Sequence, residues 1–261
     1  MGKLTGLPGK GRTFILIDGA KVNNVSQVIY RELEAPQCDA LYRETELADL
    51  SEISPWLVEA GMDSSLALKC FEEWQNLGAA IVLQADCRFE EIVDHLRGLL
   101  MARVVTGDEV IFRFYDPEIA RHLLQLDSSV EGVRRLMGPC SLIAIQDRRT
   151  GEWDCFHNDQ PNSERQSERF NIREEHQVAM ERAAERTALR KLELHVANYF
   201  PHLLHKTDTD GKDWGMVSAL VDAASRPDLP IGGRKSAAAA FSRSMKDHGI
   251  GLTIAQIQKQ E

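Results

Sequence analysis

The sequence predicts an α/β fold, a mixed sheet with flanking helices, in its N-terminal lobe, followed by an all-α C-terminal lobe. Over residues 1–157, strand-length apolar segments alternate with amphipathic segments of helix length, which is typical of a layered α/β structure. From residue 170 to 200 the chain is dense in Glu, Arg, Ala and Leu and contains no Gly or Pro, which favours one long helix. We therefore expect an α/β domain over residues 1–157, a polar linker over 158–169 and a helical lobe over 170–261.

The predicted strands are short apolar segments, most of them bounded by turn residues. We expect residues 148–151 to form a turn that joins the last two strands as a hairpin, and we expect the sheet to be mainly parallel or mixed because helices separate most strands. The predicted strands cover residues 13–18, 40–42, 55–58, 79–83, 110–115, 142–145 and 152–156.

The predicted helices show apolar residues at helical spacing. In the helix expected after Asp86, the apolar stripe includes Phe89, Ile92 and Leu96. Ser64 is expected to cap one helix, and Ser128 begins a capping-box spacing in another. The predicted helices cover residues 25–33, 64–75, 86–100, 117–126, 128–137, 170–200, 214–224, 236–248 and 252–259.

Composition narrows the function classes. The chain has 261 residues, a formal net charge of −9 and a pI near 5.5, which argues against a nucleic-acid partner and against adhesion to anionic membranes. No apolar stretch approaches the roughly 20 residues that a membrane helix needs, so no membrane insertion is expected. Five scattered cysteines without a C-x-x-C pair favour reduced thiols and a cytoplasmic location.

No segment carries a convincing catalytic, metal or cofactor motif. His195, His202 and His205 lack the H-E-x-x-H pattern of a zinc helix. Residues 208–213 resemble only part of a calcium loop, and residues 232–236 only the end of a phosphate loop. Turns and helix starts explain these segments better, so we expect no catalytic residue, no metal and no cofactor.

The most distinctive segment is the predicted strand and helix start over residues 110–117. Its alternation places Phe112 and Phe114 in the core, while Asp116 is expected to cap a helix that begins with Pro117. Arg113 and Tyr115 then lie on the opposite face of the strand. Together with Arg103, they are the candidate partner-binding residues, although a structural role for Arg113 explains the same pattern.

Four segments carry a resemblance to a known family. The chain resembles the adaptor or chaperone proteins of the bacterial type VI secretion system, the Tap/Tec type, encoded between VgrG and effector genes. The resemblance covers roughly residues 13–146, and its most specific part is the last of the four segments. These are Ile17-Asp18-Gly19-Ala20, Ala40-Leu41-Tyr42, Ser54-Pro55-Trp56-Leu57-Val58 and Phe112-Arg113-Phe114-Tyr115-Asp116-Pro117.

The resemblance implies a non-catalytic role. Such proteins hold a cognate toxic effector in the cytoplasm and help to load it onto the VgrG spike, so the expected partners are the effector and the C-terminal region of VgrG. The helical lobe over residues 170–261 would then bind the client. Two alternatives stay open from the residues alone: a small cytosolic enzyme resembling a hydrolase, and an immunity protein of the same locus.

Overall fold

The computed structural model describes residue 7 and residues 11–126, 132–148, 150–162 and 168–199. Contacts divide the chain into two units, residues 1–180 and 181–261, and helix α6 (Glu174–Tyr199) runs through that boundary. The helices and motif fragments expected after residue 200 lie outside the described residues. The expected boundaries at 157 and 170 stay a prediction, as does the all-α character of the C-terminal lobe.

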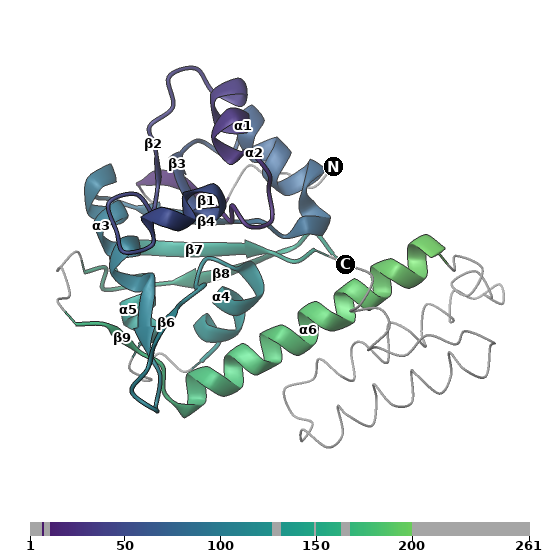
Figure 1. The fold of residues 1–261 in the computed structure, drawn as a ribbon. Helices are drawn as coiled ribbons and strands as arrows, with labels where there is room; N and C mark the ends of the chain where they lie inside the picture. Colours follow the sequence, from purple (N-terminus) through teal and green to yellow (C-terminus); the bar gives the residue numbers. More distant parts are fainter. Residues whose placement is uncertain (1–6, 8–10, 127–131, 149, 163–167, 200–261) are drawn as a thin grey trace. The chain divides into compact units, whose positions relative to one another are not determined.

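A six-stranded sheet organises the first unit (Figure 1). Its strand order is β2-β3-β1-β4-β7-β8, and every neighbouring pair is antiparallel. The strands are β1 (Arg12–Ile17), β2 (Cys38–Ala40), β3 (Trp56–Glu59), β4 (Ala80–Ala85), β7 (Cys140–Gln146) and β8 (Trp153–His157).

The expectation of a mainly parallel or mixed arrangement is wrong for this sheet. Strands β3 and β4 do run in the same direction and are joined through helical segments, as the sequence suggested. However, β1 lies between them and runs opposite to both. The helical segments between β3 and β4 therefore connect strands that share a direction but are not neighbours.

A second, three-stranded sheet has the order β6-β5-β9. Strands β5 (Met101–Arg103) and β6 (Glu109–Ile111) form an antiparallel hairpin, while β9 (Phe170–Asn171) pairs with β5 in parallel. Two expectations are wrong here. The strand predicted through Tyr115 ends at Ile111, and the helix predicted from residue 170 begins only at Glu174, because the two residues of β9 precede it.

Helices cover both faces of the six-stranded sheet, so each face buries its own core. Helices α3 (Phe89–Leu99), α4 (Pro117–Leu124) and α5 (Val133–Met137) contribute to one core. Helix α1 (Val25–Glu32), helix α2 (Ser65–Leu68) and the π-helical turn η2 (Lys69–Glu73) contribute to the other. Figure 1 shows α1 and α2 on one side of the sheet and α4 on the other.

Strand β1 shows how the sequence serves both cores. Phe14 and Leu16 pack into the core beneath α3 and α4, while Ile15 and Ile17 pack into the core beneath α1 and α2, and all four side chains are fully buried. Successive side chains of a strand point to opposite faces. A continuous apolar run is therefore what a strand covered on both faces requires.

Local signals placed several element ends correctly. The Ser64 hydroxyl accepts a hydrogen bond from the N–H of Ala67, as expected of a cap, although the helix beyond α2 continues as η2 and the 3₁₀ turn η3 (Gln75–Leu77). The hairpin of β7 and β8 is confirmed. Helix α3 begins at Phe89, three residues later than the predicted start at residue 86, and the expected capping box at Ser128 lies outside the described residues. A further 3₁₀ segment, η1 (Ala48–Ile53), precedes β3.

Candidate functional site

Chain segments that are far apart in sequence meet at one end of the six-stranded sheet. The last residue of β1, Ile17, pairs with the first residues of both β3 and β4, Trp56 and Ala80. The last residue of β2, Ala40, is also opposite Trp56. The connections that follow β1 and β2 and precede β3 and β4 are therefore close together at this end, which we call the motif end of the sheet.

Asp18, the residue directly after β1, is the buried acidic centre of the motif end. Its side chain is fully buried, and it accepts hydrogen bonds from the Arg113 guanidinium at 2.6 Å and from the backbone N–H of Ala20 at 3.0 Å. The Arg113 side chain is 41% exposed. A buried carboxylate is stable only when it is paired and hydrogen-bonded, so Arg113 holds the turn after β6 against the end of β1.

A pair of buried tyrosines makes the second link. The hydroxyl oxygens of Tyr42 and Tyr115 lie 2.7 Å apart, and the two residues are 2% and 1% exposed. Burial, followed by the hydrogen bond to Tyr42, raises the pKa of Tyr115 above its usual value. The Tyr115 phenol is therefore neutral near pH 7, and one of the two hydroxyls donates a hydrogen bond to the other.

Ser54 connects the segment before β3 to the segments after β2 and β1, through contacts with the backbone of Tyr42 and Gly19. The backbone N–H of Tyr42 donates to the Ser54 hydroxyl at 3.0 Å, and that hydroxyl donates to the carbonyl of Pro55. The carbonyl oxygen of Ser54 approaches Gly19 so closely that a Cβ there would lie only 2.1 Å from it. Glycine is required at this position by the close approach of another backbone segment.

The start of α4 confirms the expected helix cap. The Asp116 carboxylate accepts hydrogen bonds from the N–H groups of Glu118 and Ile119, at 2.9 and 3.4 Å, and Pro117 occupies the first turn. Asp116 also pairs with Lys21 at 2.8 Å. Burial alone would raise the pKa of Asp116, but the Lys21 charge and the donated hydrogen bonds outweigh it and lower that pKa.

The three candidate partner-binding residues have different surroundings. Arg113 and Tyr115 lie together, with the guanidinium carbon 5.8 Å from the tyrosine ring centre, whereas Arg103 in β5 pairs with Glu109 at 3.2 Å. Tyr115 is buried because the strand ends at Ile111 and the period-2 alternation stops there. In this fold its phenol is not accessible to a partner, while partner contact by Arg113 and Arg103 stays a prediction.

No local pattern in the sequence marks the residues that complete the motif end as a group. Asp18, Tyr42 and Ser54 belong to the family-like segments, but nothing in their spacing links them to residues 113 and 115. Lys21 lies outside those segments altogether. Phe112 and Phe114 are buried as expected, at 0% and 5% exposure.

The groups at the motif end serve packing and pairing better than they serve catalysis. The acids are paired with cations, and the tyrosines are paired with each other. Elsewhere in the first unit, burial raises the pKa of Cys70 to about 12 and also raises that of Cys140, so neither thiol is a nucleophile at neutral pH. Within the described residues no group of three metal-ligating side chains is present.

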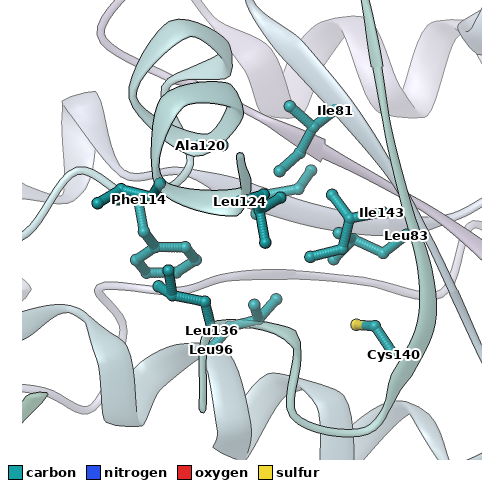
Figure 2. Close-up of a pocket in the computed structure, with 11 residues that line it drawn as sticks. Ile81, Leu83, Leu96, Phe114, Ala120, Leu124, Leu136, Cys140 and Ile143 are labelled. Carbon is teal, nitrogen blue, oxygen red and sulfur yellow. The ribbon is translucent and has the colours of Figure 1, made fainter. Parts of the chain in front are cut away.

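An apolar pocket lies between the sheet and helices α3, α4 and α5 (Figure 2). Phe114 of the family-like segment lines it, together with residues of β1, β4 and β7. The lining carries no carboxylate, imidazole or hydroxyl side chain, so it lacks the convergent polar groups of a typical small-molecule site. The lining residues are Leu16, Ile81, Leu83, Leu96, Phe114, Ala120, Leu123, Leu124, Leu136, Cys140 and Ile143.

Comparison with known proteins agrees with the resemblance. Residues 13–131 match the family described as "Domain of unknown function (DUF4123)". The accessory protein VasW of Vibrio cholerae serotype O1 (strain ATCC 39315 / El Tor Inaba N16961) is 31% identical over 117 residues, which are 43% of this chain and 37% of VasW. The chain thus spans little more than a third of that relative. No solved structure matches significantly.

The matched region contains the whole motif end. All four family-like segments fall between residues 13 and 131, and the structure brings them together through the pairs Asp18–Arg113 and Tyr42–Tyr115. Both matches are characteristic of type VI secretion effector adaptors and chaperones. Residues 13–131 therefore match the DUF4123 family, and the resemblance of the chain to the type VI secretion adaptor and chaperone family is confirmed.

Proposed function

We propose that this chain is a non-catalytic adaptor of a type VI secretion system. It binds a cognate toxic effector in the cytoplasm and helps to load that effector onto the VgrG spike. The observation that carries the proposal is the DUF4123 match over residues 13–131, since the residues that make the resemblance specific are also those that build the motif end.

The chemistry of the motif end supports a binding role. Its charged side chains neutralise one another and fix the turn before α4 onto the ends of β1 and β2. Such a network orders a surface for recognition, and it leaves no activated nucleophile or general base at the positions described above. Arg113, with 41% of its side chain exposed, is the most exposed charged side chain of this network and the one that a partner would reach first.

In this proposal the two parts of the chain have different tasks. The DUF4123 domain supplies the shared fold, and the C-terminal lobe over residues 170–261 selects the client. Helices α1, α3 and α4 turn their apolar faces toward the sheet, and an amphipathic helix of the C-terminal lobe would offer such a face to a segment of the effector.

Co-expression with the neighbouring gene products tests the proposal. The full chain, carrying an affinity tag, is co-expressed with a catalytically inactivated form of the toxin encoded beside it, and separately with the C-terminal region of the cognate VgrG. We expect a stable complex with the toxin and an interaction with VgrG. Recovery of the tagged chain without either protein would refute the adaptor function.

A deletion of the gene distinguishes the adaptor from an immunity protein. Loss of an adaptor stops delivery of the toxin and leaves the producing cell healthy. Loss of an immunity protein kills the producing cell or its sisters. Survival of the deletion strain together with loss of toxin secretion is therefore the expected result, and death of the strain would contradict the proposal.

A further inference from the structure

The six-stranded sheet ends in two edge strands, β2 and β8, which differ in how their outer edges are covered. In β8, hydrogen bonds run from the N–H of Asp147 to the carbonyl of Glu152 and from the N–H of Asn158 to the carbonyl of Ser141. These two bonds lie at the two ends of the strand and show which of its residues have their backbone N–H and C=O groups directed toward β7. Because pairing alternates along an antiparallel ladder, the backbone groups of Trp153, Cys155 and His157 point away from β7.

The outer edge of β8 is open over the part of the chain that the structure describes. None of the backbone hydrogen bonds outside regular elements involves the N–H or C=O of Trp153, Cys155 or His157. Five residues form the strand, and its first four are only partly buried. An edge of this length with free donors and acceptors is a template for another strand.

The β2 edge is closed by comparison. That strand has three residues, and the Arg97 guanidinium donates to the carbonyls of Leu41 and Ala40 at 3.2 and 3.4 Å and to the Asp39 carboxylate at 3.1 Å. A short edge strand covered by a charged side chain is protected against pairing. The same sheet thus protects one edge and leaves the other available.

We infer that the outer edge of β8 is a docking site for an extended segment of the client protein, which adds a seventh strand to the sheet. This inference rests on the proposed adaptor function and names the surface that performs it. Main-chain hydrogen bonds to Trp153, Cys155 and His157 provide the pairing, and the side chains on either face of β8 select the segment.

The two faces beside β8 call for different side chains in that segment. On the α1 and α2 face, Trp153 packs edge-on against Phe71, with ring centres 4.9 Å apart, and offers an apolar surface. On the α4 face, the Asp154 side chain pairs with Arg121 and is still 45% exposed. The segment therefore carries an apolar residue toward Trp153 and a basic residue toward Asp154.

Charge argues for such a segment over a second copy of this chain. Glu152 and Asp159, which flank β8, are exposed, and the whole chain has a net charge of −9. Two copies joined through β8 would bring these acidic margins together, and a register centred on Asp154 would place its carboxylate opposite the same carboxylate of the second copy. Like charges directly opposite each other destabilise a strand pair.

Proline substitution tests the edge without disturbing the sheet. Cys155→Pro removes an outward N–H and fills the edge with a ring, while the β7 ladder does not use that N–H. Cys38→Pro makes the same change at an outward position of β2, and Cys155→Ala removes only the thiol. The binding probe is the inactivated toxin encoded beside the gene of this chain.

We expect Cys155→Pro to weaken toxin binding by about tenfold or more, because the substitution removes a backbone hydrogen bond and its ring blocks the approach of another strand. Cys38→Pro and Cys155→Ala should bind as the wild type does. If wild-type protein binds and Cys155→Pro binds equally well, the docking site is wrong while the adaptor function stands. If the wild-type protein itself does not bind, both proposals are overturned.

Hydrogen exchange gives a readout that does not depend on a variant folding. On toxin binding, the amides of Trp153, Cys155 and His157 should become protected, whereas those of Asp154 and Phe156, which face β7, should be protected before and after. Protection of the Cys155 amide in the free chain would show that the chain itself covers the edge and would overturn the inference. A wild-type dimer that dissociates in Cys155→Pro would overturn it in favour of a second copy.

Discussion

The buried tyrosine pair gives a direct test of how the motif end is held together. Tyr42 follows β2 and Tyr115 precedes α4, and their hydroxyls lie 2.7 Å apart with almost no exposure to solvent. Over the described residues neither hydroxyl makes a second hydrogen bond. The perturbation is Tyr115→Phe, which removes one hydroxyl and leaves the other buried without a partner.

The expected cost follows from that loss. A buried hydroxyl without a partner costs about 1–3 kcal/mol of unfolding free energy. Tyr115→Phe and Tyr42→Phe should each destabilise the first unit by that amount. The double variant loses both hydroxyls and leaves no unpaired group, so its cost should be about 1 kcal/mol. The coupling free energy, which is the sum of the two single costs minus the cost of the double variant, is then about 1–5 kcal/mol.

The wild type, the two single variants and the double variant form a double-mutant cycle. Their free energies of unfolding are measured by urea unfolding at pH 7, with tryptophan fluorescence as the signal. Tyr30→Phe is the matched control, because Tyr30 is 63% exposed and the change should stay within about 0.5 kcal/mol of the wild type. Two strictly additive single effects, or a Tyr115→Phe protein as stable as the control, would refute the proposed linkage.

Alkaline pH provides a second measurement on the same pair. Burial raises the pKa of Tyr115 above the ordinary tyrosine value of about 10, so the folded chain keeps the phenol protonated when the unfolded chain ionises it. The unfolded state is therefore favoured as pH rises above 10. Wild-type stability should fall in that range, and Tyr115→Phe should lose less stability there. Parallel pH profiles for the two proteins would contradict the assignment.

Three further predictions concern the first unit. Gly19→Ala should cost about 1–3 kcal/mol in urea unfolding because its Cβ meets a backbone oxygen, whereas Gly98→Ala, with no neighbour within 4 Å, should gain up to about 1 kcal/mol. Arg113→Ala should cost about 1–3 kcal/mol because the buried Asp18 carboxylate loses its hydrogen-bonded cation, while Lys21 stays 4.0 Å away. Arg103→Ala, in an exposed pair, should cost less than about 1 kcal/mol by the same measurement. Burial lowers the pKa of His95 from 6.5 to about 4, so stability should fall by at most about 3 kcal/mol as pH drops from 6.5 to 4; an equal loss in His95→Gln would contradict this.

Local patterns were sufficient for the elements whose signals lie within a few residues. Strand β1, helix α1 and the capped start of α4 follow from an apolar run, an amphipathic stripe and the Asp116-Pro117 pair. The β7–β8 hairpin follows from a turn with Gly151. In each case the residues that decide the structure are also those that display the signal.

The site depends instead on contacts that no local pattern contains. Asp18 and Arg113 are 95 positions apart, and Tyr42 and Tyr115 are 73 apart. Their meeting requires the strand order of the sheet, in which consecutive strands are not always neighbours. The alternation rule also placed Tyr115 outward because it assumed a strand that continued to residue 115, whereas the chain turns after Ile111.

The strand order has a consequence for the borders of the domain. The similarity to the DUF4123 family ends at residue 131, but β7 and β8, which complete the six-stranded sheet, span residues 140–157, and β9 adds residues 170–171 to the smaller one. A fragment that ends at residue 131 lacks β7, so it would expose the edge of β4 that pairs with β7 and the apolar side chains beside it. A fusion that replaces the C-terminal part of this chain should therefore keep residues 1–180, which form the first unit. The segment that is similar to the family, residues 13–131, is shorter than the first unit of the structure, residues 1–180.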